Sequence, residues 1–187
     1  MGKKGEGNRL RIVDAAEYLF YKSGYNQTSF QDISDATDIP RGNFYYYFKT
    51  KEDILTAVVE ARVDSLKKLL ARYDAEILDP RERLLMFSSV LDRDASKIIA
   101  IGCPTGSLSL ELSKGDAALH EKSKQAFVVL CDWMEKQFDL MGLDNPDQLA
   151  MDLVARLQGI HMVANVFKDP EYLKRSSIDL KKWISEQ

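Results

Sequence analysis

Residues 28–53 of the chain, TSFQDISDATDIPRGNFYYYFKTKED, decide the fold that the sequence predicts. Thr28 and Gln31 have the Ser/Thr-x-x-Glu/Gln spacing of a capping box, which predicts the start of a helix. Ile39 precedes Pro40, and a residue before proline is disfavoured in the helical region, so this helix is expected to end just before it. Proline suits the first turn of the next helix, where its missing N–H is not needed. The stretch therefore predicts a helix, a short turn and a second helix, the order of a helix-turn-helix.

The predicted second helix, residues 40–48, presents aromatic and small polar side chains outward. Phe44 and Phe48 are four residues apart, so they share one side of the helix and are expected to face the core. The three consecutive tyrosines, residues 45–47, point around more than half of the helix and cannot all be buried. Tyrosine hydroxyls donate to phosphate oxygens, and arginine pairs with guanine through two hydrogen bonds. The pattern favours insertion into a DNA major groove over the alternative, a solvated helix with surface aromatic side chains.

Residues 38–55, DIPRGNFYYYFKTKEDIL, resemble the recognition helix and the following helix start of the TetR (tetracycline-repressor) family of bacterial transcriptional regulators. The family pattern is G-V/I-S-x-G-T-hydrophobic-Y-x-Y/H-F-x-x-K-E-x-L. Asp38, Pro40 and Asn43 depart from its glycine, serine and threonine, which concerns the base preference and not the fold. The upstream sequence resembles the family's first two helices, so the specific match covers about residues 9–55. The matching residues in the quoted stretch are Ile39, Gly42, Phe44, Tyr45, Tyr47, Phe48, Lys51, Glu52 and Leu55.

The resemblance implies an all-α protein whose N-terminal three-helix domain, residues 1–50, carries the helix-turn-helix and binds DNA. A larger helical domain, residues 51–187, is then expected to bind an effector and to form a homodimer. The implied function is a ligand-responsive repressor of transcription that binds a palindromic operator, with an activator of the same fold as the alternative. The base-edge candidates are Arg41, Gly42, Asn43 and Tyr46, and the phosphate candidates are Thr28, Gln31, Tyr45, Tyr47 and Lys51.

The composition is that of a soluble globular protein, with 45% hydrophobic and 29% charged residues. No run of about 18 apolar residues predicts a membrane span, and the N-terminus lacks the apolar segment of a secretory signal. Two distant cysteines do not form a disulfide framework, so a cytoplasmic protein is expected. The net charge is −3, yet residues 1–51 hold eight basic and six acidic residues, which gives +2 there and −5 in the remainder. This small asymmetry has the sign expected of an N-terminal nucleic-acid interface.

Turn residues and apolar spacing divide the rest of the chain into further helices. Residues 1–8 are expected to be disordered, with basic side chains that either reach into a minor groove or form a solvated tail. Gly24 is expected to end the first helix, and Thr50 is expected to cap a long helix that reaches residue 78. The other expected helices cover residues 9–23, 81–92, 117–141 and 147–167 and a short segment after Pro170.

Residues 147–167 form a predicted helix with a broad apolar surface. Such a surface can face both a core and a partner helix, and Gly159 permits close approach. In TetR-like proteins two such helices per subunit form a four-helix dimer interface, and two-fold symmetry suits a helix-turn-helix. The alternative is an ordinary helical core. The predicted interface residues are Leu149, Leu153, Leu157, Gly159, Ile160, Ala164 and Phe167.

Residues 101–113, IGCPTGSLSLELS, predict a turn followed by a helix and contain no recognised catalytic motif. Cys103 and His161 are therefore better explained as structural or pocket residues than as catalytic groups of a small helical enzyme, which is the alternative class. His120 and His161 have no further ligands at metal-binding spacing, so no metal or cofactor is predicted. The expected effector is an apolar or aromatic small molecule. The predicted pocket residues are Met86, Phe87, Val90, Cys103, Leu108, Phe127, Trp133, Met134 and His161.

Overall fold

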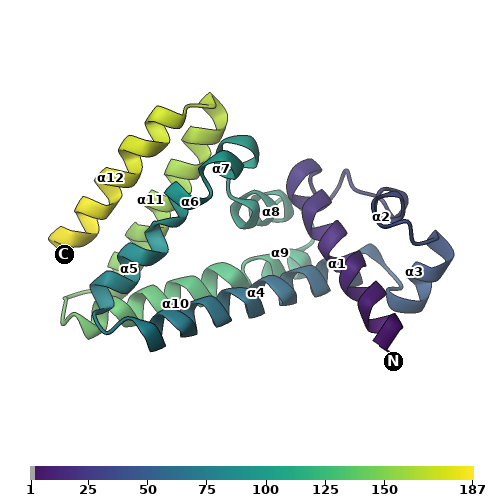
Figure 1. The fold of residues 1–187 in the computed structure, drawn as a ribbon, viewed down its shortest axis with the longest axis horizontal. Coiled ribbons are helices and arrows are strands. Elements are labelled where there is room, and N and C mark those ends of the chain that lie inside the picture. The colour runs from purple at the N-terminus through teal and green to yellow at the C-terminus, as the bar shows by residue number, and fades with distance from the viewer. Residues whose placement is uncertain (1–2) are drawn as a thin grey trace. The chain divides into compact units, whose positions relative to one another are not determined.

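The computed structural model describes residues 3–187, apart from the side chains of Lys3, Lys4 and Arg41, and its regular structure in this range is α-helical (Figure 1). The all-α fold class is thereby confirmed. The helices are α1 (Lys3–Ser23), α2 (Phe30–Thr37), α3 (Arg41–Tyr47), α4 (Lys51–Glu76), α5 (Pro80–Ser88), α6 (Val90–Arg93), α7 (Ala95–Ile101), α8 (Pro104–Leu112), α9 (Ala117–Ser123), α10 (Gln125–Leu140), α11 (Pro146–Phe167) and α12 (Pro170–Glu186). None of the helices within residues 3–187 combines the length and the hydropathy that a membrane crossing requires.

The helices group into two compact units, which are described separately. The first unit runs to residue 64, partway along α4, and also contains residues 105–126 with most of α8 and all of α9. The second unit contains residues 65–104 and 127–187. The first unit thus contains the helix-turn-helix together with the first half of α4 and the α8–α9 segment, and the boundary after residue 50 stays a prediction.

The first unit is built on contacts of α1 with α2 and of α2 with α3. Its largest fully buried side chains include Ile12, Phe20 and Ile33. Because α1 begins at Lys3, the expectation of disorder is wrong for residues 3–8. Glycines disfavour a helix there, but tertiary contacts outweigh that cost.

Two contacts join the start of α1 to the end of α3. Asn8 Nδ2 donates to Tyr47 Oη at 3.4 Å. The guanidinium of Arg9 lies over the ring of Phe48, 5.1 Å from its centroid, in a cation–π contact. Arg9 is therefore engaged within the chain in this structure.

Two predicted helices are each divided in two. The one predicted over 81–92 breaks between α5 and α6 at Ser89, whose hydroxyl donates to the Met86 carbonyl (2.6 Å). The one predicted over 117–141 breaks between α9 and α10, just after Ser123, whose hydroxyl donates to the His120 carbonyl (2.8 Å). Serine hydroxyls that bond to carbonyls of the preceding turn compete with the helix ladder, which favours a break.

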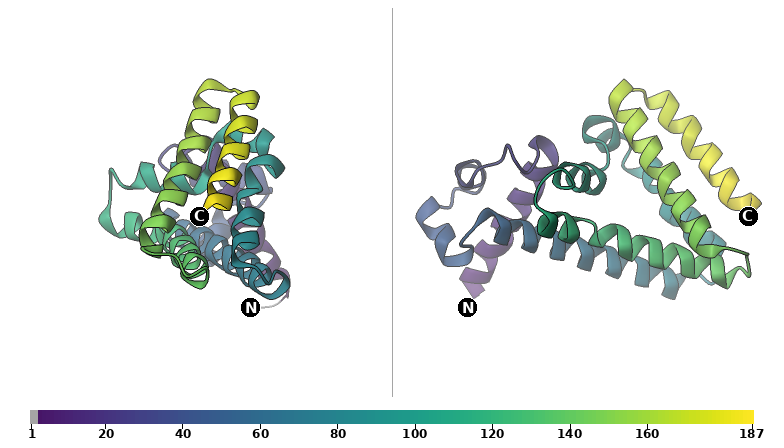
Figure 2. Two further views of the ribbon diagram at one scale, coloured as in Figure 1. Left: turned by 90° about the vertical axis from the view of Figure 1, so that its left-hand side faces the viewer. Right: turned by 180° about the vertical axis from the view of Figure 1, so that it is seen from behind.

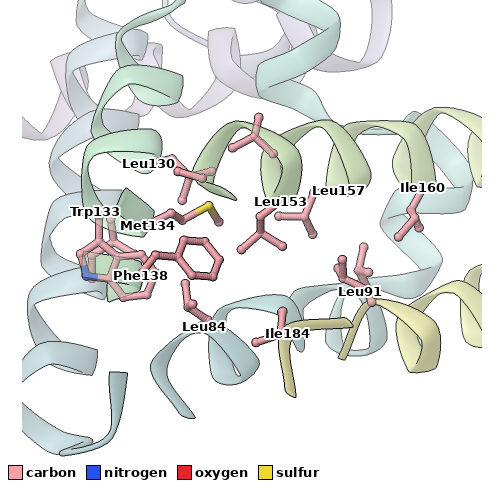
Figure 3. Packing of buried hydrophobic residues seen from close by; sticks show 14 of the residues in the cluster. Leu84, Leu91, Leu130, Trp133, Met134, Phe138, Leu153, Leu157, Ile160 and Ile184 are labelled. Atoms are coloured by element: carbon pink, nitrogen blue, oxygen red, sulfur yellow. The ribbon is translucent and has the colours of Figure 1, made fainter. Parts of the chain in front are cut away.

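The core of the second unit lies among α10, α11 and α12, together with α5 to α7 (Figures 2 and 3). Met134 and Phe138 extend from α10 toward Leu153 of α11, whereas Trp133 lies on another side of α10. The terminal helix α12 contacts α5, α6, α7 and α11 along its length, so it is longer than the short segment expected and belongs to this core.

The inner side of α11, which carries most of the predicted dimer-interface residues, faces this core. Leu153, Leu157, Ile160 and Ala164 are buried within the chain's own core, and Leu149 packs against its margin. Of the other predicted interface residues, Phe167 is exposed and Gly159 has open space where a Cβ would lie. Apolar spacing indicates which side of a helix is buried, but not whether its own chain or a second chain covers that side.

A largely buried arginine joins the end of α4 to α5 and α10. Arg83 Nε donates to the Ile77 carbonyl (2.8 Å), Nη1 to Gln137 Oε1 (2.9 Å) and Nη2 to the Asp74 carbonyl (3.2 Å). The Asp74 carboxylate lies 3.6 Å from Arg83 Nη1 and accepts from Trp133 Nε1 (3.0 Å). The fixed fork of the guanidinium reaches acceptors that a single ammonium group cannot reach together.

We predict that Arg83→Lys lowers the free energy of unfolding by about 2 kcal/mol, because it leaves buried acceptors without donors. Urea denaturation followed by circular dichroism measures the change. Arg72→Lys is the matched control, since the Arg72 side chain is 58% exposed and its contact with Glu76 spans 3.9 Å. An exposed pair of this kind contributes less than about 0.5 kcal/mol. Equal losses in the two variants would contradict the role given to Arg83.

Candidate nucleic-acid interface

A capping box fixes the start of α2, one residue later than predicted. Ser29 Oγ accepts from the Asp32 N–H (3.2 Å), and the Ser29 N–H donates to Asp32 Oδ2 (2.7 Å). The backbone N–H and then the hydroxyl of Ser29 hold the pKa of the Asp32 carboxyl below its usual value. The capping box predicted for Thr28 and Gln31 is therefore wrong. Thr28 is 2% exposed and its hydroxyl donates to the Gly24 carbonyl (2.7 Å), so that proton is not available to a phosphate.

The turn between α2 and α3 is tight, as the sequence predicts. Asp38 has φ 54°, in the left-handed region that aspartate tolerates better than most residues. Ser34 Oγ donates to the Ile39 carbonyl across the turn (2.7 Å). Arg11 Nη2 of α1 donates to the Thr37 carbonyl (2.5 Å) at the end of α2. These contacts fix the direction in which the chain enters α3.

Buried phenylalanines anchor α3. Phe44 and Phe48 are buried, as predicted, and the Phe44 ring meets that of Phe30 edge to face at 6.1 Å. The Tyr45 ring stacks on Phe30, with ring centroids 5.9 Å apart. The rings on this side of α3 are thereby held against α2.

The outward side of α3 is open to solvent. Tyr46 is 72% and Tyr45 45% exposed, and Gly42 and Asn43 are exposed as well. A Cβ at Gly42 would have no described atom beyond its own neighbourhood in the helix within 4 Å, so among the described residues the space in front of this backbone is open. The side chain of Arg41, the fourth base-edge candidate, lies outside the described residues.

The remaining phosphate candidates flank this outward side. Gln31 is exposed and its Nε2 donates to Asp35 Oδ1 (2.7 Å). Tyr47 is half-buried and its oxygen accepts from Asn8, which leaves its own proton to donate. Lys49, next to α3, bonds to the Tyr45 carbonyl.

A surface depression of about 400 Å³ adjoins the start of α2. The first N–H groups of a helix have no partner inside that helix and attract anions. Sequence reasoning missed Asn26 and Gln27, which share this depression with Gln31, because a turn asparagine or glutamine has no motif of its own. The lining residues are Asn26, Gln27, Thr28, Ser29, Phe30, Gln31 and Lys51.

Lys51 is directed toward the turn between α1 and α2. Its Nζ donates to the carbonyls of Tyr25 (3.0 Å) and Thr28 (3.1 Å) and lies 4.2 Å from the Tyr25 ring centroid. An ammonium has three donors, so one remains for a further partner. Tyr25 Oη donates to Glu52 (3.2 Å), and burial together with this carboxylate raises the pKa of Tyr25. Lys51 thus has a structural task that the sequence prediction did not include.

The predicted effector residues do not share one environment. Met134 and Trp133 belong to the core of the second unit, and Trp133 packs between Tyr73 and Phe87. Met86 is 45% exposed on α5, whereas Leu108 belongs to the first unit. Phe87, Val90 and Phe127 are half-buried at the core margin.

Two of the predicted pocket residues are polar and lie near or on α11. Gln158 Nε2 donates to Cys103 Sγ (3.5 Å). His161 is buried, its Nδ1 lies 2.6 Å from the Leu157 carbonyl, and burial lowers the pKa of the imidazole. Within the described residues, no group of three or more His, Cys, Asp or Glu side chains is placed to hold a metal ion.

Comparisons with known proteins agree with this geometry. Residues 12–58 match the model of the family described as bacterial regulatory proteins, tetR family. An uncharacterised HTH-type transcriptional regulator from the lacX 3' region of Lactococcus lactis subsp. lactis is 33% identical over 185 residues, which covers 95% of this chain and 92% of that protein. The HTH-type transcriptional repressor DhaR of Mycobacterium sp. (strain GP1) is 27% identical and aligns with 56% of this chain and 52% of its own.

Solved structures share the fold of this chain along its length. The crystal structure of a TetR transcriptional regulator from Chloroflexus aurantiacus J-10-FL matches with a TM-score of 0.86 and 22% identity, covering 100% of this chain and 98% of that one. The relative from Lactococcus lactis is similar along nearly its full length, and the helix-turn-helix is complete in the structure. The chain therefore belongs to the tetR family and is a DNA-binding, helix-turn-helix regulator of transcription.

Proposed function

We propose that this regulator is a cytoplasmic homodimer that represses transcription from a palindromic operator and responds to a small-molecule effector. The observation that carries the proposal is the outward side of α3, where Gly42, Asn43 and Tyr46 are exposed while Phe44 and Phe48 are buried behind them. A helix held from behind and open in front is what insertion into the major groove requires.

Base contacts are assigned to the outward side of α3. Arg41 and Asn43 carry the side-chain types that bond to guanine and adenine edges through two hydrogen bonds, and Gly42 allows close approach to a base. Tyr46 completes this set. Contacts to the DNA phosphates are assigned to Gln31, Tyr45 and Tyr47, to the remaining donor of Lys51, and to the first N–H groups of α2.

The dimer is assigned to the outer face of α11, defined here as Met151, Ala155, Gly159, Met162 and Val166. These residues recur every three or four positions and so form one stripe along the helix. Met151, Met162 and Val166 are 56%, 62% and 66% exposed. Long apolar side chains along a whole helix side, with a glycine at the centre, fit a two-fold contact between copies of α11.

The proposals of repression and of a response to an effector are based on resemblance to related regulators, not on a binding site in the structure. DhaR is named as a repressor, and its resemblance covers 56% of this chain. An apolar or aromatic effector is assigned to the second unit, with Cys103, Gln158 and His161 as polar groups near α11. An effector shifts DNA affinity only to the extent that it binds one conformational state better than the other.

A catalytic role for Cys103 or His161 is not part of the proposal. His161 is buried, and its Nδ1 is engaged by a backbone carbonyl of its own helix. A general base must reach a substrate proton, which this position does not favour. The relatives compared above are transcriptional regulators.

We predict that Arg41→Ala relaxes the base preference of the protein. Loss of a bidentate guanine contact costs about 1–3 kcal/mol of discrimination, or about 5- to 150-fold at one position of the half-site. The measurement is selection of bound sequences from a random DNA pool at near-physiological salt, for the wild type and the variant.

The control is Arg72→Ala, which removes the same charge from an exposed position on α4. It is expected to select the same two-fold symmetric site as the wild type. An unchanged preference in Arg41→Ala would show that Arg41 does not read a base.

We predict that Met162→Glu separates the dimer. Two-fold symmetry brings the new carboxylates of the two copies close together in an apolar contact, which raises the dimer dissociation constant by about 100-fold. Analytical ultracentrifugation across a concentration series measures this constant, and operator affinity is expected to fall with it.

Met86→Glu places the same substitution at another exposed methionine, which lies on α5 and not on α11. This control is expected to sediment as the wild type does. If Met162→Glu still dimerised as the wild type does, the outer face of α11 would not form the dimer interface.

A further inference from the structure

The turn between α1 and α2 is held from a part of the chain that lies far away in sequence. Glu111 of α8 accepts two backbone hydrogen bonds, from the Tyr25 N–H to Oε2 (2.9 Å) and from the Asn26 N–H to Oε1 (2.8 Å). These pairs are separated by 86 and 85 residues. Each carboxylate oxygen serves one N–H, so the contact is bidentate and charge-assisted, the stronger class of hydrogen bond.

The backbone at Gly24 is shaped for this carboxylate. Gly24 has φ 91°, a conformation that other residues adopt only with strain. A Cβ at this position would lie 3.1 Å from Glu111 Oε2, so the absence of a side chain also lets the carboxylate come close. The glycine therefore ends α1 and admits Glu111 to the turn.

The opposite edge of the same turn is held by a cation. Lys51 of α4 donates to the carbonyls of Tyr25 and Thr28, at 3.0 and 3.1 Å. The N–H groups of the turn thus meet an anion, and its carbonyls meet a cation. With both edges paired in this way, residues 24–28 have little freedom to rotate as long as Glu111 and Lys51 stay in place.

The segment that carries Glu111 is itself tied to the first unit. Ser109 Oγ of α8 donates to the Ser123 carbonyl of α9 (3.0 Å). Lys122 Nζ of α9 donates to Thr56 Oγ1 of α4 (2.9 Å). Glu111 is therefore part of a network that links α8 and α9 to the same helix that supplies Lys51.

We propose that Glu111 is a positioning residue for DNA binding: its carboxylate sets the α1–α2 turn, and through it the start of α2, in the orientation that the operator requires. The turn runs directly into Ser29, the N-cap of α2, and its residues line the depression beside that helix start. The proposal rests on DNA binding by this protein. It adds a residue that touches neither base nor phosphate, on a helix outside the helix-turn-helix.

The test is Glu111→Gln. An amide has the same shape as the carboxylate, but only its oxygen accepts, so at most one of the two turn N–H groups keeps a strong partner. The substitution also removes a negative charge, which by itself strengthens binding to DNA. The proposed positioning role predicts weaker binding instead. The affinity for the sequence that the wild type selects is expected to fall about tenfold, equivalent to about 1.4 kcal/mol.

The matched control is Glu121→Gln, which makes the same change of charge on α9. Glu121 is exposed and pairs with Lys124 on its own segment, not with the turn. Its affinity for the selected sequence is expected to equal or slightly exceed that of the wild type. Affinity of Glu121→Gln for non-specific DNA is expected to stay within about twofold of the wild type. Glu111→Gln is expected to lose less affinity for non-specific DNA than for the selected sequence, because only some of the phosphate contacts depend on the start of α2.

Amide hydrogen exchange separates positioning from a general loss of structure. In the wild type the Tyr25 and Asn26 amides are expected to be protected, and in Glu111→Gln these two amides exchange faster while those of α1 and α4 do not. The groove beside Glu111, about 720 Å³, makes the carboxylate reachable from solvent, so its replacement disturbs no closed core.

Three results would overturn the proposal. The first is rapid exchange of both amides in the wild type, which would mean that the carboxylate does not hold the turn in solution. The second is unchanged affinity of Glu111→Gln for the selected sequence. The third is an equal loss on selected and non-specific DNA. If the wild type itself selects no sequence, the interpretation as a DNA-binding regulator fails first, and the role of Glu111 fails with it.

Discussion

The reading surface of α3 depends on the burial of Phe44 and Phe48. Phe44 on α3 and Phe48, the extended residue that follows the helix, are both buried, and the outward side of α3 is left to solvent. Full burial of each ring contributes about 1.5–3 kcal/mol, far more than any single surface contact of the helix. The exposure of Tyr45 and Tyr46 is therefore a consequence of packing behind them, and it does not require that the tyrosines themselves prefer solvent.

The direction of α3 is set by polar contacts that surround this apolar anchor. Ser34 closes the turn before α3, and Arg11 holds the end of α2 from α1. Glu111 and Lys51 fix the turn that precedes α2. Each bond alone contributes about 1 kcal/mol, but together they remove the freedom of both ends of α2. The protein has a net charge of −3 and only a weak basic excess in its N-terminal residues. Specificity for a DNA sequence therefore has to come from the orientation of α3 and not from charge.

Local signals in the sequence predicted the local structure well. Asp38 before Pro40, Gly24 at the end of α1 and Thr50 before α4 mark helix ends within a few residues of themselves, and the structure has helix ends at each. The capping box was misplaced by one residue because Thr28-Ser29 offers two adjacent hydroxyls. Long-range pairs left no such signal: nothing in residues 24–28 indicates a partner at Glu111, more than 80 residues away.

The same limit explains the dimer prediction. Leu153, Leu157 and Ile160 have the strongest apolar spacing on α11, and the chain's own α10 and α12 cover them. The methionines on the other side produce a weaker sequence pattern, although they are the apolar side chains left in solvent. A helix with apolar residues on two sides predicts two contacts, and only the folded chain distinguishes the side that is already covered.

Helix α8, which carries Glu111, is one of three helices, with α4 and α10, that belong partly to each unit. Pro104 at its start belongs to the second unit, whereas Glu111 belongs to the first. Just before α8, Asn165 Nδ2 and Lys168 Nζ donate to the Ile99 carbonyl, both at 2.9 Å. A ligand that binds better when these bonds are broken would favour a conformation in which α8 has moved. Operator DNA that requires the Glu111 contact would favour the conformation seen here. The two affinities are then coupled by the same free energy in both directions, so an inducer would be weakened by operator DNA as strongly as it weakens operator binding.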